Sequence, residues 1–216
     1  MTTRRPWVVG VSGASGTAYA EAVIGGLLDA GHPVDLVVSR AARLTLLDET
    51  GVAFRDAHWK DDLAAWIGRS VGEADLAYWS PGDFAAGPSS GSYLTRGMVV
   101  VPASTAAVAG IALGLSKDLL QRAADVNLKE GRPVVVVPRE TPLGRSHLVH
   151  LLALHDAGAT VLPASPGFYA GKPSVQELVD FVAGKVLDAL GVEHTLFTRW
   201  RGELRTDRTN SGPIPE

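Results

Sequence analysis

Short apolar runs that alternate with helical patterns constrain the fold of this chain more than any other feature. The apolar runs lie at residues 7–11, 34–38, 98–101, 134–137 and 160–162. The helical patterns lie at residues 15–30, 41–50, 104–114, 116–130, 143–157 and 174–190. Strands that are apolar along their whole length are typical of a parallel sheet with helices on both faces. We therefore predict an α/β fold, a Rossmann-like (flavodoxin-like) three-layer sandwich with a mostly parallel sheet.

Two parts of the chain have less regular patterns. Residues 51–96 show no clear period, although they hold several aromatic residues and end in the small-residue stretch GPSSGS. Within the helical pattern at 41–50 we expect Leu44 and Leu47, with the neighbouring alanines, on the buried side. The region after Gly191 is polar apart from Leu196, Phe197 and Trp200. We therefore expect one domain over residues 1–190 and a C-terminal tail over 191–216.

Composition excludes several classes of protein. The formal net charge is −3 and there is no basic stripe, so we expect no nucleic-acid partner. The chain has no cysteine, which excludes disulfides, thiolate metal sites and a cysteine nucleophile. No apolar segment approaches the roughly 20 residues that span a bilayer, and the apolar run near the N-terminus is too short for a secretory signal. We therefore expect a cytoplasmic protein without a membrane segment.

The stretch from Arg122 to Pro142 carries charged residues beside a buried strand. Arg122 and Lys129 are seven residues apart, so a helix places both cations on one face. Arg139 and Glu140 directly follow the apolar run at 134–137, at the strand end where open α/β sheets bind ligands. We expect these cations and this carboxylate to converge on an anionic, phosphorylated substrate. A solvated helix face and a loop ion pair are the alternative.

Hydroxyl-bearing turns follow other predicted strands. The first turn, GVSGASG at residues 10–16, has serines where a dinucleotide fingerprint has its second and third glycines, and it lacks the ending of a Walker A loop. Such a turn favours a mononucleotide phosphate or the polar edge of a flat ring, and a purely structural turn is the alternative. Ser39 and Ser104 occupy similar turns, where each is equally suited to capping a helix. Three such turns at one sheet edge favour a binding site.

Residues that resemble metal ligands do not form a convincing motif. Asp61 and Asp62 resemble the start of the aspartate motif of prenyl-diphosphate enzymes, but no second aspartate pair exists. His147, His150 and His155 share one predicted helix without a nearby carboxylate pattern. Gly87-Pro-Ser89-Ser-Gly91 fits the spacing of a nucleophile elbow, but no strand leads into it. The sequence therefore indicates no metal.

The chain resembles the flavin prenyltransferases, the UbiX family. The resemblance covers about residues 7–200. The motifs that carry it come in the family's order: VSGASG (11–16), SRAARLTLLDET (39–50), SSGS (89–92), VPAST (101–105), RAADVNLKEGRPVVVVPRETPL (122–143) and PASPGFYAGKPSV (163–175). The block at 122–143 and the Pro-Gly-Phe-Tyr segment are the specific ones. The first glycine-serine turn alone would not be.

The resemblance implies an enzyme that modifies a flavin. Such an enzyme joins the dimethylallyl group of dimethylallyl monophosphate to N5 and then C6 of reduced FMN, without a metal. The product, prenylated FMN, serves a UbiD-type decarboxylase. Residues 1–190 would form a single FMN-binding flavoprotein domain, and the 191–216 tail would pack on a neighbouring subunit. The family's large homo-oligomers, such as dodecamers, have their sites at subunit interfaces.

The resemblance also implies site residues, matched position by position. Flavin contacts are implied at Gly13, Ala14, Ser15, Ser39, Ser104, Thr105, Ala106, Ala107 and Arg139. Residues that bind or act on the prenyl phosphate are implied at Arg122, Lys129, Glu140, Tyr169 and Lys185. Catalytic roles are implied for Ser15, Glu49, Lys129 and Glu140.

These roles agree with the chemistry of allylic phosphates. Cations in a dry site stabilise the leaving phosphate. Glu140 would give that phosphate a proton, and Glu49 would take the proton lost from the flavin ring. A carboxylate beside a phosphate must be protonated or paired with Arg139 or Lys129. Phe84 and Trp200 are candidate walls for the prenyl cation, with an ordinary core position as the alternative.

The chain departs from the family's pattern at a few positions. Phe84 stands where the best-known members have tryptophan, which implies weaker stabilisation of the prenyl cation or a different pocket shape. Ala103 replaces a cysteine that many members carry. Ala106 and Ala107 replace more polar residues, so flavin contacts there must come from the backbone.

Two rival functions remain open at the level of sequence. The first is an FMN-dependent cysteine-type decarboxylase, which shares the fold. Such enzymes carry a Pro-x-Met-Asn-x-x-Met motif, whereas this chain has Pro138-Arg-Glu-Thr-Pro142 in the corresponding loop. The second is a non-catalytic FMN-binding accessory subunit of a decarboxylase. The set of charged residues around Lys129 and Glu140 favours the transferase over this subunit.

Overall fold

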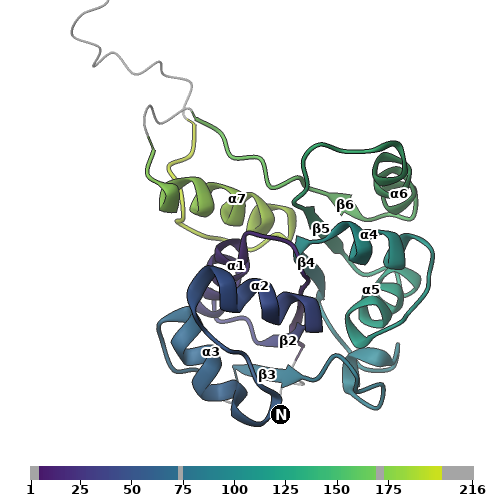
Figure 1. Ribbon diagram of the computed structural model, residues 1–216, viewed down its shortest axis with the longest axis horizontal. Helices are drawn as coiled ribbons and strands as arrows, with labels where there is room; N and C mark the ends of the chain where they lie inside the picture. The colour runs from purple at the N-terminus through teal and green to yellow at the C-terminus, as the bar shows by residue number, and fades with distance from the viewer. Residues whose placement is uncertain (1–4, 73–74, 169–172, 201–216) are drawn as a thin grey trace, which may run out of the picture.

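A parallel sheet forms the centre of the molecule (Figure 1). The structure is a computed structural model that describes residues 5–72, 75–168 and 173–200. Within these residues the sheet has the order β3-β2-β1-β4-β5-β6, and all its pairings are parallel. The strands are β1 (Trp7–Val11), β2 (Val34–Val38), β3 (Leu76–Trp79), β4 (Gly97–Ala103), β5 (Val134–Pro138) and β6 (Thr160–Val161). The predicted α/β sandwich is therefore confirmed.

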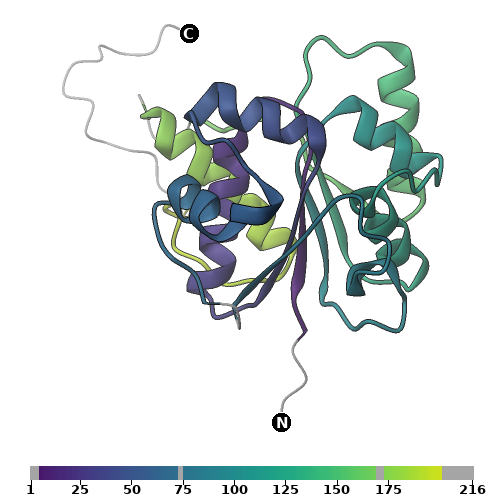
Figure 2. The same cartoon turned by 60° about the horizontal axis from the view of Figure 1, so that its bottom comes forward.

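Helices cover both faces of this sheet, as Figure 2 shows from the side. One layer contains α1 (Thr17–Asp29), α2 (Arg40–Thr50), α3 (Trp59–Ile67) and α7 (Val175–Ala189). The other contains α4 (Thr105–Ala112), α5 (Leu119–Lys129) and α6 (Arg145–Asp156). Two short 3-10 helices, η1 (Asp56–His58) and η2 (Gly87–Ser89), lie in the connections. Within the described residues, no helix has the length and apolar character needed to cross a membrane.

Successive residues of each central strand face opposite layers, which explains the continuous apolar runs. Val9 and Val99 pack with α1 and α7, whereas Val8 and Val100 pack with α4 and α5. Every residue of β1, β2, β4 and β5 is buried. The two cores together hold the sheet in place because burial of apolar surface is the main stabilising term in folding.

The prediction for the buried side of α2 was wrong. Leu44 is 73% exposed and Leu47 is 46% exposed, whereas Ala42 and Leu46 are buried. Ala42 and Leu46 are four residues apart and share one helix face, from which Leu44 points almost directly away. The irregular segment 51–96 contains α3 and the edge strand β3, which the sequence analysis did not assign. Only Leu76 of β3 is fully buried, and its four residues, Leu-Ala-Tyr-Trp, include none of the valines that mark the central strands.

Candidate functional site

A cavity of about 410 Å³ opens at the carboxyl ends of β1, β2 and β4. The strand order reverses between β1 and β4, and ligands of open α/β sheets bind at such a reversal. Gly13 follows β1, Ser39 follows β2 and Ser104 follows β4, so the prediction that hydroxyl-bearing turns gather at one edge is confirmed. The full lining is Ser12, Gly13, Ser39, Arg40, Ala41, Pro81, Gly82, Ser104, Ala106, Ala107, Lys117, Asp118, Leu120 and Gln121.

Ser12 connects the turns after β1 and β4. Its buried hydroxyl donates to the carbonyl oxygen of Pro102 at 2.8 Å and accepts from the Ser104 amide at 2.7 Å. The Ser12 hydroxyl hydrogen is therefore used inside the protein and is not free to be donated to a phosphate. A serine at this position fixes the distance between the two turns.

Ser39 and Ser104 begin helices at the wall of the cavity. The Ser39 hydroxyl accepts from the Ala42 amide at 3.1 Å, and the Ser104 hydroxyl accepts from the Ala107 amide at 3.2 Å. Each is thus the N-cap of its helix, which was the alternative role that the sequence left open. A hydroxyl that accepts one hydrogen bond still has its own hydrogen to donate. Capping and ligand binding are therefore compatible at both serines.

Glu49, in the last turn of α2, binds the first residues of α1 through its carboxylate. Its carboxylate accepts from the Gly16 amide at 2.8 Å, the Thr17 amide at 2.8 Å and the Thr17 hydroxyl at 2.7 Å. Burial alone would raise the pKa of Glu49, but the hydrogen bonds from Thr17, Ser15 and Gly16 outweigh it and lower the pKa. The carboxylate is therefore ionised near neutral pH, and it holds the turn that carries Gly13 and Ser15.

Arg139 joins the end of β5 to the same turn. Its Nε donates to the Ser15 carbonyl oxygen at 3.0 Å, and its amide donates to the Ala103 carbonyl oxygen at 3.2 Å. Arg139 therefore lies with the turns that carry the other predicted flavin contacts, including Ala14 and Thr105. Glu140 is exposed, and its Oε1 accepts from the Thr141 amide at 3.0 Å.

Lys129 lies near the amino ends of the strands and Glu140 near their carboxyl ends, which corrects the expectation that they converge. Lys129 is the last residue of α5 and comes just before β5, whereas Glu140 comes just after β5. A five-residue strand spans about 16 Å. The helix runs antiparallel to the strand that follows it, so the end of α5 lies far from the carboxyl end of β5. A single copy of the chain cannot bring Lys129 and Glu140 to one ligand.

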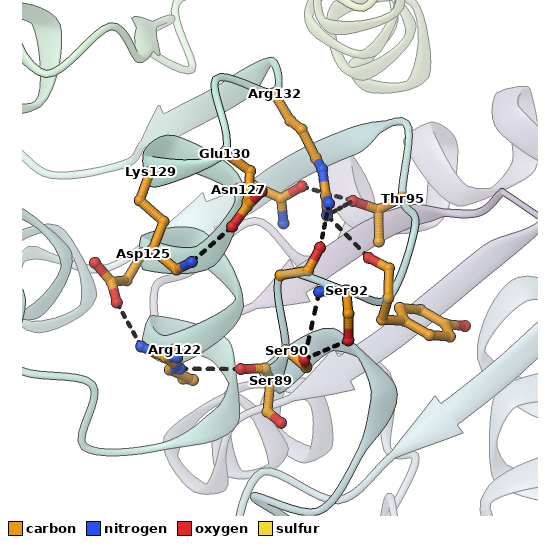
Figure 3. A network of polar contacts seen from close by, with 12 residues as sticks. Ser89, Ser90, Ser92, Thr95, Arg122, Asp125, Asn127, Lys129, Glu130 and Arg132 are labelled. Atoms are coloured by element: carbon orange, nitrogen blue, oxygen red, sulfur yellow. Dashed lines mark hydrogen bonds and ion pairs between the residues drawn. The ribbon is translucent and has the colours of Figure 1, made fainter.

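Lys129 instead lies with Arg122 against residues 89–92, here called the serine turn (Figure 3). Arg122 Nε donates to the Ser89 carbonyl oxygen at 3.0 Å, and its Nη1 pairs with Asp125 Oδ2 at 2.8 Å. Lys129 Nζ pairs with Glu130 Oε1 at 2.7 Å, not with Glu140. A Cβ atom on Gly91 would collide with the Glu130 carboxylate and lie 3.1 Å from Lys129 Nζ. The predicted sharing of one helix face by Arg122 and Lys129 is confirmed.

The remaining predicted substrate residues are distributed around the chain. Lys185 lies on α7, where its Nζ is 3.5 Å from Asp188 Oδ2. Phe84 is 49% exposed and Trp200 is 67% exposed, so the alternative of an ordinary core position is wrong for both. Tyr169 lies outside the described residues.

Sequence reasoning missed several residues at these sites. Pro81 and Gln121 line the cavity but carry no reactive group that a motif search could find. Arg132 contacts the serine turn, and its only signal was its place in the Gly-Arg-Pro break after α5. Asp188 binds Arg199 and His194 as well as Lys185, which a helix pattern alone does not reveal.

In the aspartate pair at 61–62, Asp62 has a structural role. Arg55 donates to the Asp62 carboxylate from its amide at 2.8 Å, its Nε at 3.0 Å and its Nη2 at 2.5 Å. Across residues 5–72, 75–168 and 173–200, no group of three or more histidine or carboxylate side chains is placed to hold a metal ion. The Asp62 carboxylate anchors the start of α3 to the preceding segment.

Comparison with known proteins identifies the family. The family model described as Flavoprotein matches residues 1–187. A flavin prenyltransferase UbiX from Streptomyces coelicolor is 65% identical over 208 residues, which cover 92% of this chain and 96% of that protein. This chain belongs to the UbiX family. The resemblance drawn from its motifs is thereby confirmed.

Solved structures agree with membership of the UbiX family. A UbiX crystal structure in complex with FMN and dimethylallyl pyrophosphate is 35% identical, with a TM-score of 0.81, and the match covers 93% of this chain and 99% of that one. A dodecameric FMN-dependent UbiX-like decarboxylase from Escherichia coli is 38% identical, with a TM-score of 0.80, over 91% of this chain and 100% of that one. The UbiX fold therefore covers nearly the whole chain.

Proposed function

We propose that this protein is a flavin prenyltransferase that joins the dimethylallyl group of dimethylallyl monophosphate to N5 and C6 of reduced FMN. The observation that carries the proposal is the cavity at the strand reversal, which brings together Gly13, Ser39, Ser104, Ala106 and Ala107 in a chain 65% identical to a UbiX enzyme. The reaction is a metal-independent group transfer, and FMN is its acceptor.

The residues around the cavity fit FMN. Backbone amides of the first turn, two serine hydroxyls and the Arg139 guanidinium provide donors for a phosphate and for the polar edge of the ring. Ala106 and Ala107 have no polar side-chain atoms, so their contribution comes from the backbone and from van der Waals contact. Reduced FMN supplies an electron-rich ring with nucleophilic N5 and C6 positions.

The chain's own residues handle the charge that the transfer moves. The allylic C–O bond breaks, phosphate leaves, and the freed prenyl carbon bonds to flavin N5, which loses a proton. The prenyl double bond then takes up a proton as its far carbon bonds to C6, and C6 loses its own proton, so that the net transfer is one proton from the flavin to the phosphate. Arg122 and Lys129 stabilise the negative charge of the departing phosphate, and Glu140 gives it a proton. The ionised Glu49 accepts the proton that the ring loses. Its lowered pKa makes Glu49 a weaker base than an ordinary glutamate but keeps it ready to accept.

The separation of Lys129 from Glu140 supports a site shared between two copies of the chain. The serine turn of one copy, with its Arg122 and Lys129, completes the cavity of a neighbour. A homo-oligomer, dodecameric like the Escherichia coli protein, provides such neighbours. Exposed leucines on one side of the molecule supply an apolar surface for the contact; they are Leu113, Leu115, Leu143, Leu148 and Leu152.

The same proposal covers the rest of the chain. Residues 1–190 form the FMN-binding domain. The start of the tail expected over 191–216 packs on its own chain, because Val192 is buried, Phe197 contacts Phe181 and Arg199 pairs with Asp188. The part of the tail that reaches a neighbouring subunit therefore begins near Trp200. The exposed Trp200 ring, with Phe84, then becomes a wall of a shared prenyl pocket. Tyr169 and Lys185 contribute to phosphate binding. The protein works in the cytoplasm and passes prenylated FMN to a UbiD-type decarboxylase.

The experiment that tests this function is anaerobic incubation with reduced FMN and dimethylallyl monophosphate, followed by mass spectrometry of the released flavin. We expect a flavin heavier by one C5 prenyl unit. A parallel reaction with dimethylallyl diphosphate identifies the preferred donor. Unmodified flavin from protein that binds FMN would contradict the proposal and favour an accessory subunit. The Lys129→Ala variant is the control, because it should bind FMN normally and lose prenyl phosphate.

A further inference from the structure

The serine turn makes only short-range hydrogen bonds along its own segment. The Ser90 and Ser92 hydroxyls lie 2.9 Å apart, and the Ser92 amide donates to the Ser90 hydroxyl at 3.4 Å. The amides of Ser89 and Ser90 each donate at 3.0 Å to carbonyl oxygens three residues earlier, and the Tyr93 amide donates to the Ser90 carbonyl oxygen at 3.2 Å. Ser90 and Ser92 are exposed. A short polar turn at the surface buries little apolar area, so its shape depends on ties to its neighbours.

Arg132 supplies these ties from the segment after α5 (Figure 3). Its Nη2 donates to the Gly91 carbonyl oxygen at 2.6 Å, and its Nη1 donates to the Tyr93 carbonyl oxygen at 2.9 Å. The planar guanidinium therefore binds two carbonyl groups of the turn region at once, which the single ammonium of a lysine does not reproduce in the same geometry. Arg122 holds the other end of the turn through the Ser89 carbonyl oxygen.

A chain of hydrogen bonds fixes Arg132 to the interior of α5. Arg132 Nη1 also donates to the Thr95 hydroxyl at 3.1 Å, and that hydroxyl donates to Asn127 Oδ1 at 2.7 Å. Asn127 is fully buried, and its Nδ2 donates to the Ala123 carbonyl oxygen at 2.8 Å. The Arg132 amide donates to the Asn127 carbonyl oxygen at 2.9 Å. Buried polar groups that are all satisfied form rigid supports.

We propose that Arg132, supported by Thr95 and Asn127, is a positioning residue that holds the serine turn beside Arg122 and Lys129 in the shape that binds the phosphate of the prenyl donor. The inference rests on the proposed function, because it takes the prenyl phosphate as the ligand of this turn. Arg132 itself binds carbonyl groups and does not contact the reacting atoms.

The test compares Arg132→Lys and Thr95→Val with the wild-type oligomer loaded with oxidised FMN, in which transfer does not occur. Calorimetric titration with dimethylallyl monophosphate should show affinity at least about tenfold weaker in both variants, because misplacement of a binding group by about 1 Å has large effects. FMN affinity should stay within about twofold. With reduced FMN, KM should rise while kcat changes little, since the lost interaction is uniform binding.

Arg69→Lys is the matched control. Arg69 also donates to a backbone carbonyl, that of Gly25 at 3.0 Å, but it lies in the opposite helical layer. It should leave prenyl phosphate binding unchanged. Thermal melting of each variant shows whether the fold is intact.

Each outcome bears on the proposal. Unchanged affinity for the prenyl phosphate in Arg132→Lys would overturn it, as would a parallel loss of FMN and prenyl phosphate affinity. If both variants fail to fold, the residues are purely structural and the positioning role is rejected. Weakened binding without prenylated flavin from the wild type would leave Arg132 in its role and remove the transferase function. Normal turnover by all variants would remove the positioning role of Arg132 and leave the transferase function in place. Wild type that does not bind dimethylallyl monophosphate would remove both.

Discussion

At the scale of single residues, Glu49 shows how one side chain joins distant parts of the site. It lies near the end of α2, yet its carboxylate accepts hydrogen bonds from Gly16 and Thr17 at the start of α1. A negative charge at a helix N-terminus also interacts favourably with the helix dipole. The turn that carries Gly13 and Ser15 therefore depends on a residue that no local pattern connects to it.

Replacement of Glu49 by glutamine should reduce stability in a pH-dependent way. Loss of the charge at the α1 N-terminus should cost about 1 kcal/mol, screened by solvent, and lower Tm by about 2–4 °C at pH 7. The pKa of Glu49 is lowered from its ordinary value of 4.5, so its contribution is full above that pH and is lost as the pH falls through the lower folded-state pKa. The Tm difference between wild type and variant should therefore narrow below pH 4.5. A difference independent of pH in thermal melts would contradict this role, and Glu193→Gln at an exposed position is the control.

Glu140 allows a test of acid catalysis separate from binding. Glu140→Gln removes the proton donor but keeps the size of the side chain, so FMN affinity should stay unchanged. Turnover should fall by about 100-fold or more, as is usual for loss of a general acid. Flavin binding measured by fluorescence and anaerobic turnover measured by mass spectrometry give the two quantities. Full activity in this variant would end the assignment of Glu140 as the proton donor.

At the scale of elements, the contact between α1 and α7 depends on a glycine. A Cβ atom on Gly26 would lie 2.5 Å from Leu187 Cδ1, and Leu187 is fully buried, so it has no free space to move into. The neighbouring Gly25 has no atom within 4 Å of an added Cβ. A methyl group would therefore be crowded at Gly26 and unhindered at Gly25, although the two glycines are adjacent in one helix.

This difference predicts opposite effects of the same substitution. Gly25→Ala should stabilise the protein by roughly 0.5–1 kcal/mol, because alanine favours the helix more than glycine does. Gly26→Ala should destabilise it by about 1–2 kcal/mol, since overpacking against Leu187 exceeds the gain in helix propensity. Chemical denaturation of both variants gives the free energies of unfolding. Equal effects of the two changes would show that α7 can move away from α1.

The predictability of the fold also differed between elements. The buried strands β1, β2, β4 and β5 were evident from sequence because residues enclosed on both faces leave a continuous apolar run. The edge strand β3 was not evident, since its four residues, Leu-Ala-Tyr-Trp, include none of the valines that mark the central strands and stand in a segment with other aromatic residues. Leu44 and Leu47 misled the assignment of the buried face of α2, because large apolar residues at the surface look the same in sequence as core residues. Whether such a residue is covered depends on tertiary packing or on other chains, which local periodicity does not encode.

At the scale of the whole molecule, the site was predictable in its parts but not in its layout. The turns that carry Gly13, Ser39 and Ser104 lie where strand-end rules place them. Lys129 does not lie at the carboxyl ends of the strands, where it was expected. A spacing of seven residues shows which helix face a residue occupies, but not which end of the strands it lies near. Arg132 was missed, since its function depends on carbonyl groups that are far away in sequence.

The proposed assembly predicts the effect of a charge on α6. Leu152 is 60% exposed in a single chain, so Leu152→Glu should leave folding intact but disfavour subunit contact. We expect a smaller particle by size-exclusion chromatography with light scattering, together with loss of prenyl transfer. Ala65→Glu, which puts the same charge on an exposed position of α3 in the other layer, should leave particle mass unchanged. Wild-type mass for Leu152→Glu would mean that this face is not an interface.

The placement of Lys129 and Glu140 near opposite ends of the strands has a genetic consequence. If the site is shared between two copies as proposed, a chain with a defective Lys129 keeps an intact cavity of its own and damages the reaction centre of its neighbour. Chains with Lys129→Ala and chains with Glu140→Gln, each inactive alone, should therefore complement one another when co-expressed. Random mixing would pair an intact cavity with an intact lysine at about a quarter of the centres.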